Sequence, residues 1–282
     1  MRTILPFLFS IALLGSTPTY AEDIFIIKAG GRSPSDTINQ LSYQLHSKLP
    51  NSKIVQIGEH EPSDLASKTA KYIVLGRSGF SFAVSNLNPT SYIIAGLPFV
   101  PTGHIGAPYR IAPDTLIKSI KKANLGIAGI SVIYSTPNAQ YVNSLKEALA
   151  HDDLTLNAQM VNSRDKVLDS YAEFFSQPDS KQALLVLYDP MATQNGVLLP
   201  YIATNAWKYK LVTITTFPKY VKLGILLGIY PTVRSTANVI IKRLHSQSTL
   251  FPRETVLSIN KKAVERRGLP LSKQSDTIVI YH

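Results

Sequence analysis

Cysteine is absent from this 282-residue sequence, and its absence excludes two classes of extracellular protein. Small secreted domains often depend on disulfide bonds, which this chain cannot form. Bacterial lipoproteins carry their lipid on a cysteine at the cleavage site, so that kind of anchor is excluded too. With 45% hydrophobic and 17% charged residues, the chain is instead long and apolar enough to build sizeable cores of its own.

Long apolar runs are missing beyond the N-terminus. The most apolar later stretch, Leu223 to Pro231, is far shorter than the roughly 20 residues of a membrane-spanning helix. The first residues follow the order of a secretory signal: Arg2, an apolar segment from Ile4 to Leu14, and small residues around Thr19-Tyr20-Ala21. We predict a cleaved signal peptide at residues 1–21, with a retained anchor as the alternative. Without a lipid anchor, the mature protein is expected in the periplasm of a Gram-negative cell.

Acidic residues are scarce: 18 Asp and Glu stand against 29 Lys and Arg, giving a net charge of +11. Such a balance attracts anionic partners. The basic residues are scattered, however, and their densest group is Lys261, Lys262, Arg266 and Arg267. This group is interpreted as a solvated helix face, with an anionic lipid surface or an acidic patch on a partner as alternatives. Export argues against a nucleic-acid partner.

Catalytic and metal-binding motifs are also missing. The sequence has no Walker loop, no His-Glu-x-x-His and no Gly-x-Gly-x-x-Gly. The run from Gly76 to Phe80 approaches the Gly-x-Ser-x-Gly turn of hydrolases, but Phe80 occupies the last glycine position. The six histidines are dispersed, without the spacing of metal ligands. We therefore expect no enzymatic activity, no metal and no cofactor.

What the sequence does contain is a regular alternation of strand-like apolar runs and amphipathic helical segments. Several strands read as buried on both faces, which is typical of parallel sheets covered by helices. The fold class predicted is therefore α/β, with doubly wound parallel sheets. Strands are expected near 23–29, 53–57, 72–75, 91–97, 127–134, 154–161, 183–188 and 211–217, and helices near 35–49, 64–70, 114–123, 141–149, from 163, and 197–209.

The second half of the chain resembles a known family. GIAGISVIYSTPNAQYVNSLKEA from Gly126, ALLVLYDP ending at Asp189-Pro190, FPKYVKLGILLGIYPTVRSTANVIIKRL and TVLSINKKAVERRGLPLS are similar to segments of the TrpX-like ABC transporter substrate-binding proteins. The likeness covers roughly residues 124–272. Pro101 to Pro113 stands where the family usually has Pro-Gly-Gly-Asn-x-Thr-Gly. The resemblance implies two lobes that clamp a small ligand for an importer.

The Pro- and Gly-rich stretch from 98 to 113 marks a boundary between two lobes. We predict a type I periplasmic-binding-protein architecture. Its first α/β lobe comprises residues 23–108 plus a return segment 218–250, and its second comprises 109–217 plus 251–282. The crossings form a hinge, and ligand binding biases an open–closed equilibrium.

In open α/β sheets, ligands bind beyond the carboxyl ends of the strands. Two glycine-bearing loops there, containing Arg32-Ser33 and Arg77-Ser78-Gly79, offer backbone N–H groups, a helix dipole and an arginine to a ligand carboxylate. The alternative for Ser78 is a simple helix N-cap.

Other candidates lie in the second half. Asp189 ends an apolar strand, so its carboxylate needs a partner; a ligand ammonium is one possibility and an Asp-Pro turn the other. Tyr134, with Ser135 beside it, Phe217 and Tyr220 are candidates for stacking on an aromatic ligand, although aromatic residues are also ordinary core material.

These features predict a monomeric periplasmic protein that captures a small organic ligand, such as an amino acid or another aromatic or carboxylate compound, for an ABC permease. The alternative is a sensory or accessory protein that presents a ligand or a surface to the periplasmic domain of a signalling receptor. A secreted hydrolase using Ser78 is a third reading, for which the sequence offers no suitably placed histidine.

Overall fold

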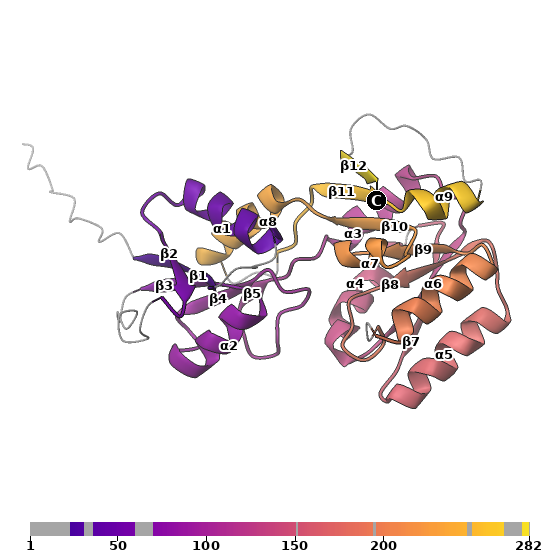
Figure 1. Cartoon of the computed structure of the whole chain (residues 1–282), viewed down its shortest axis with the longest axis horizontal. Helices are drawn as coiled ribbons and strands as arrows, with labels where there is room; N and C mark the ends of the chain where they lie inside the picture. Colours follow the sequence, from indigo (N-terminus) through magenta and orange to yellow (C-terminus); the bar gives the residue numbers. More distant parts are fainter. Residues whose placement is uncertain are drawn as a thin grey trace, which may run out of the picture.

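The computed structural model describes residues 23–30, 36–59, 70–150, 152–193, 196–246, 250–267 and 278–281, which form two α/β lobes (Figure 1). The predicted signal peptide, Arg32, Ser33 and most of the helix expected near 64–70 lie outside these residues. Two parallel-dominated sheets, one in each lobe, confirm the predicted fold class.

The smaller lobe contains a five-stranded sheet of order β2-β1-β3-β4-β5, parallel throughout. Its apolar strands are buried on both faces, and successive residues of one strand serve different cores: Ile26 packs with one cluster and Ile27 with the other. The strands are β1 (Ile24–Ala29), β2 (Lys53–Ile57), β3 (Lys71–Leu75), β4 (Tyr92–Ala95) and β5 (Gly106–Ala107).

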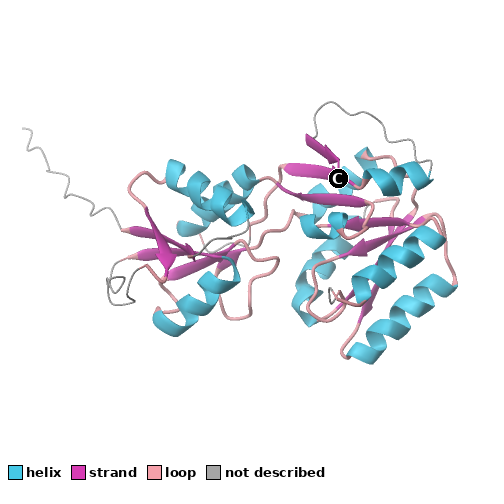
Figure 2. Ribbon diagram, viewed as in Figure 1, coloured by secondary structure: helices cyan, strands magenta, loops and turns pink. Residues whose placement is uncertain are grey.

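Helices cover both faces of this sheet (Figure 2). On one face, α1 (Asp36–Lys48) packs beside α8 (Val233–Leu244), and Leu41 and Ile240 from these two helices share a core with β1 and β3. On the other face, α2 (Gly76–Asn86) contributes Ala83 to the second core. Spacings of three and four between apolar residues place each helix's apolar stripe on its sheet.

The larger lobe contains a seven-stranded sheet of order β12-β11-β10-β9-β8-β6-β7, parallel except for the β10–β11 pair. Mixed sheets of this kind carry an antiparallel pair toward one edge. The strands are β6 (Gly129–Tyr134), β7 (Thr155–Met160), β8 (Gln182–Val186), β9 (Val212–Thr215), β10 (Leu227–Pro231), β11 (Thr255–Ile259) and β12 (Ile278–Tyr281).

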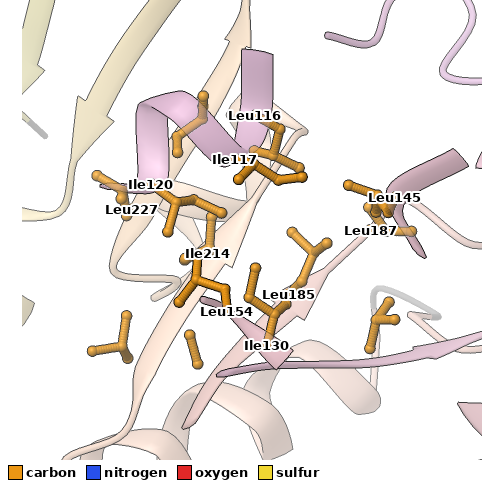
Figure 3. Packing of buried hydrophobic residues seen from close by; sticks show 14 of the residues in the cluster. Leu116, Ile117, Ile120, Ile130, Leu145, Leu154, Leu185, Leu187, Ile214 and Leu227 are labelled. Carbon is orange, nitrogen blue, oxygen red and sulfur yellow. The ribbon is translucent and has the colours of Figure 1, made fainter. Parts of the chain in front are cut away.

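Two apolar cores lie on opposite faces of the larger sheet. The first brings α3 (Pro113–Lys122) and α4 (Ala139–Leu149) onto the strands; Figure 3 shows side chains of α3 near those of β6, β8, β9 and β10. The second packs α5 (Arg164–Ser176) and α6 (Leu198–Lys208) on the other face. Two short helices complete the lobe: α7 (Pro218–Lys222) and α9 (Lys261–Arg267). Within the described ranges, no helix is both long and apolar enough to cross a membrane.

The chain passes between the lobes at 108–112, at Thr232 and at 250–254 (Figure 1). Hydrogen bonds tie these crossings together: the Ala112 amide donates to the Pro252 carbonyl at 3.0 Å, and the Thr232 amide to that of Glu254 at 3.0 Å. Of the predicted return segment 218–250, α8 packs in the smaller lobe, whereas α7 and β10 belong to the larger lobe. The wholly buried strand β10 fills the place between β9 and β11, so the chain crosses only after Pro231.

Thr232 caps α8 at this crossing, because its hydroxyl oxygen accepts a hydrogen bond from the Ser235 amide at 3.0 Å. Replacing Thr232 with alanine is expected to lower the free energy of unfolding by about 1 kcal/mol, measured by urea denaturation. The control is Thr232→Ser, which keeps the hydroxyl and should stay close to wild type. Equal losses in the two variants would contradict the capping role.

Candidate functional site

A cavity of about 500 Å³ lies between the lobes, and we call it the interlobe cleft. It is lined from the smaller lobe by the start of α1, by α2 and by the loop that follows β4, and from the larger lobe by the loops that follow β8 and β9. Parallel strands bring their carboxyl ends to one edge of a sheet, so the loops of both lobes meet here. Its charged and aromatic lining residues are Arg77, Phe80, Phe99, Tyr109, Tyr188, Phe217 and Lys219.

Aromatic rings form the wall of the cleft on the larger lobe. The ring centroids of Tyr188 and Phe217 are 4.9 Å apart, and those of Phe217 and Tyr220 are 5.1 Å apart in an edge-to-face contact. Phe99, from the smaller lobe, approaches Tyr188 to 6.3 Å. Such pairs stabilise each other's orientation and leave flat apolar faces for a planar partner.

Two cationic side chains accompany these rings. Arg77, in the first turn of α2, donates from Nη2 to the Tyr188 hydroxyl at 3.1 Å, which links the two lobes. Lys219, two residues after Phe217, is exposed and lines the cleft. An arginine fork and an ammonium beside apolar rings suit a ligand that has both a flat group and a negative charge.

Asp189 lies just behind Tyr188 and is 2% exposed. Its Oδ1 accepts from the Ser135 hydroxyl at 2.7 Å and from the amides of Met191 and Ala192 at 2.9 and 2.8 Å. Its Oδ2 accepts from the Ser135 amide and from Asn138 Nδ2, both at 2.7 Å. Five donors from the chain itself therefore solvate this carboxylate. The geometry supports a positioning role for Asp189, since the protein already supplies the partners that a buried carboxylate needs.

The electrostatics of Asp189 agree with its geometry. Burial raises the pKa of the carboxyl, but the hydrogen bonds from the Ala192 amide and from the hydroxyl and amide of Ser135 outweigh burial. The net effect holds the pKa of Asp189 below its usual range, so the group is ionised at neutral pH.

Asn138 extends this network toward the hinge. Its Nδ2 also donates to the Tyr188 carbonyl at 3.1 Å, and its Oδ1 accepts from Arg110 Nη2 at 2.6 Å. Arg110 belongs to the crossing segment 108–112 and is 3% exposed. One buried amide thus connects a crossing segment to the backbone that carries the cleft residue Tyr188.

The three residues of α2 that were predicted to bind a ligand have different surroundings. Arg77 lines the cleft, whereas Ser78 is exposed and is the third residue of the helix. Ser78 is therefore not the N-cap, a position that Leu75 occupies without a side-chain cap. Gly79 is buried against the sheet. A Cβ atom at this position would lie only 3.2 Å from Val74 Cγ1 and 3.3 Å from the Ile27 carbonyl oxygen. Its small size lets α2 approach the sheet closely.

The predicted aromatic residues of the larger lobe also differ in their surroundings. Phe217 lines the cleft. Tyr220 packs against Phe217 and does not line the cleft. It is 1% exposed, its hydroxyl contacts the Thr193 hydroxyl at 3.0 Å, and burial raises its pKa to about 12. Tyr134 is partly buried against the core on the α3 and α4 face, and Ser135 is engaged with Asp189.

Sequence reasoning missed Tyr188, Phe99 and Tyr109 as lining residues. Tyr188 directly precedes Asp189 at the carboxyl end of β8, so its position alone was a usable signal. Phe99 and Tyr109 lie in the Pro- and Gly-rich stretch, which has no periodicity that would orient a side chain. Among the described residues, no group of three His, Asp or Glu side chains is placed to hold a metal ion.

No family model and no curated protein matches this sequence. Solved structures do. A ligand-free, open substrate-binding protein with adhesive properties from Clostridium difficile matches with a TM-score of 0.60 and 14% identity, covering 93% of this chain and 99% of that one. The ABC domain from Streptococcus pneumonia in complex with L-Trp has a TM-score of 0.55 and 13% identity, covering 92% and 100%. A conserved domain protein from Vibrio cholerae has a TM-score of 0.56 and 12% identity, covering 89% and 96%. At these identities the likeness establishes a shared two-lobed fold.

Proposed function

We propose that this protein binds a small organic ligand in the interlobe cleft, and that the ligand combines an aromatic or other flat group with a carboxylate. The observation that carries the proposal is the cleft itself: about 500 Å³ between the strand ends of both sheets, with Phe99, Tyr188 and Phe217 on its walls. That volume lies within the usual range of small-molecule sites, which are mostly apolar with a few polar groups. Arg77 and Lys219 are the groups that would pair with the carboxylate.

Two of the structural neighbours support this reading. One is described as a substrate-binding protein, and another was solved with L-Trp bound. The resemblance of residues 124–272 to TrpX-like substrate-binding proteins favours the same role. We further propose that the chain is exported by residues 1–21, works in the periplasm as a monomer without catalysis, and delivers its ligand to an ABC permease. A receptor domain is the alternative recipient.

Binding closes the two lobes in this proposal. Contacts from both lobes to one ligand give the closed form a higher affinity than the open form, which shifts the population toward closure. The Arg77–Tyr188 hydrogen bond shows that the side chains of the two lobes already reach each other across the cleft.

The test is a calorimetric and thermal-shift screen of the mature protein with L-Trp, L-Tyr and indole-3-acetate, and with L-Ala and acetate as non-aromatic counterparts. We expect at least one aromatic compound to bind and raise the melting temperature; at 100 times its Kd a ligand adds about 2.7 kcal/mol of stability. Binding of L-Ala as tight as that of L-Trp, or no binding by any aromatic member, would overturn the aromatic assignment.

A further inference from the structure

A second cavity, of about 830 Å³, shares Pro98, Phe99 and Pro101 of its lining with the interlobe cleft. We call it the hinge-side cavity, because Arg110 and Phe251 from two of the crossing segments line it. The loop from 98 to 108 forms its wall on the smaller lobe. The 3₁₀ turn Thr136–Asn138 and the first turns of α4 form its wall on the larger lobe.

Arg110 is the unusual group in this cavity. The residue is 3% exposed, and its guanidinium carbon Cζ lies 4.4 Å from the centroid of the Tyr141 ring, which also lines the cavity. A guanidinium has five N–H donors. One hydrogen bond is found for them among the described residues, from Nη2 to Asn138 Oδ1, and the buried Nε has no partner there.

The charge of Arg110 is also poorly matched. No salt bridge to Arg110 is found in the part of the chain that the structure describes. The nearby carboxylate of Asp189 is separated from it by the Asn138 amide and is already bound by five other donors. A buried cation without a paired anion is costly. Burial accordingly lowers the pKa of Arg110 to about 10, although Tyr141 and Asp189 oppose this change.

We propose that the hinge-side cavity is a second binding site, for a small organic anion whose carboxylate or phosphate pairs with Arg110. A guanidinium is planar, and two neighbouring N–H groups of it form a fork that matches such oxyanions. Gln140 and Ser144 on α4 add polar contacts, and Phe99, Val100 and Phe251 provide an apolar wall for the rest of the molecule.

This site goes beyond the proposed function, because the cation and the helix that line it, Arg110 and α4, do not line the interlobe cleft. The two cavities share Pro98, Phe99 and Pro101 but are anchored by Arg110 and by Arg77 respectively. An anion here would contact both lobes and a crossing segment, so its binding would affect the hinge directly.

The experiment uses the mature wild-type protein with inorganic phosphate and, separately, butyrate, a carboxylate without an aromatic group, against sodium chloride at equal ionic strength. We expect one of the two probes to bind by calorimetry and to raise the melting temperature, which also tells phosphate from carboxylate preference. Arg110→Met removes the charge at similar length and should weaken binding of that probe at least tenfold. Ser144→Phe leaves Arg110 in place, adds a ring to the wall that α4 forms, and should weaken binding of the probe as strongly.

Two variants serve as controls. Asn143→Phe places the same ring on an exposed position of α4 that does not line the cavity, and Phe217→Ala changes a residue that lines the interlobe cleft but not the hinge-side cavity. Both should bind the probe as wild type does. The proposal is overturned if neither probe binds better than chloride, if Ser144→Phe or a folded Arg110→Met binds as wild type does, or if Phe217→Ala loses binding. If no aromatic compound binds but the anion probe does, the proposed function fails and the proposal of the hinge-side site is retained.

Discussion

Replacing Asp189 with alanine is expected to lower the free energy of unfolding by about 3–5 kcal/mol, measured by urea denaturation. The change leaves the Ser135 amide and hydroxyl, Asn138 Nδ2 and the amides of Met191 and Ala192 without their acceptor in a buried place. Each unsatisfied buried donor costs about 1–3 kcal/mol before relaxation. The variant also removes a carboxylate whose charge acts on Arg110.

Asp169→Ala is the matched control, because this aspartate is exposed on α5. Its loss should change stability by no more than about 0.5 kcal/mol. A loss at Asp189 as small as that at Asp169 would show that the five hydrogen bonds contribute little. A ligand that binds Asp189→Asn as it binds wild type would support the positioning role over a direct ammonium contact.

The dependence of stability on pH is a second way to measure the contribution of the Asp189 carboxylate. The folded pKa of Asp189 is held below its unfolded value of about 3.9, so its stabilising contribution is complete above that pH. The contribution is lost as the pH falls through the folded pKa. We therefore expect the wild type to lose stability in acid below about pH 4 more steeply than Asp189→Asn, in thermal melts recorded from pH 7 to pH 2.

Replacing Phe217 with alanine is the second large effect that we expect. The variant removes the ring that contacts Tyr188 at 4.9 Å and lines the interlobe cleft. Affinity for the tightest-binding aromatic compound of the screen should fall by about 10–100-fold, or about 1.4–2.8 kcal/mol, as is typical when a central aromatic residue is truncated. Calorimetry on the folded variant measures this separately from any loss of stability.

Phe82→Ala is the control for Phe217. Phe82 is also partly buried, but it packs in the core of the smaller lobe and does not line the cleft. It should lower stability and leave the affinity unchanged. If both variants bind alike, the aromatic wall is not where the ligand stacks.

The alternation of the sequence was sufficient to predict most of the strands and helices. Runs such as 183–187 are apolar at every position, and α3 repeats its apolar residues Leu116, Ile117 and Ile120 at helical spacing. These patterns are local, and local periodicity decides which face of an element is buried. The segment from 218 to 231 shows the limit of that reasoning, because its place in the larger sheet depends on pairing with β9 and β11.

The cysteine-free sequence by itself determined the α/β class, the two-lobed organisation and the loops at the carboxyl ends of the strands. Only the tertiary structure decided which of these loops meet. Arg77 and Tyr188 are 111 positions apart, and Arg110 and Asn138 are 28 apart, yet each pair is hydrogen-bonded. The physical reason is that such contacts depend on how the two lobes and the segments between them are oriented. That orientation results from the packing of the whole chain, so no local pattern of residues predicts it.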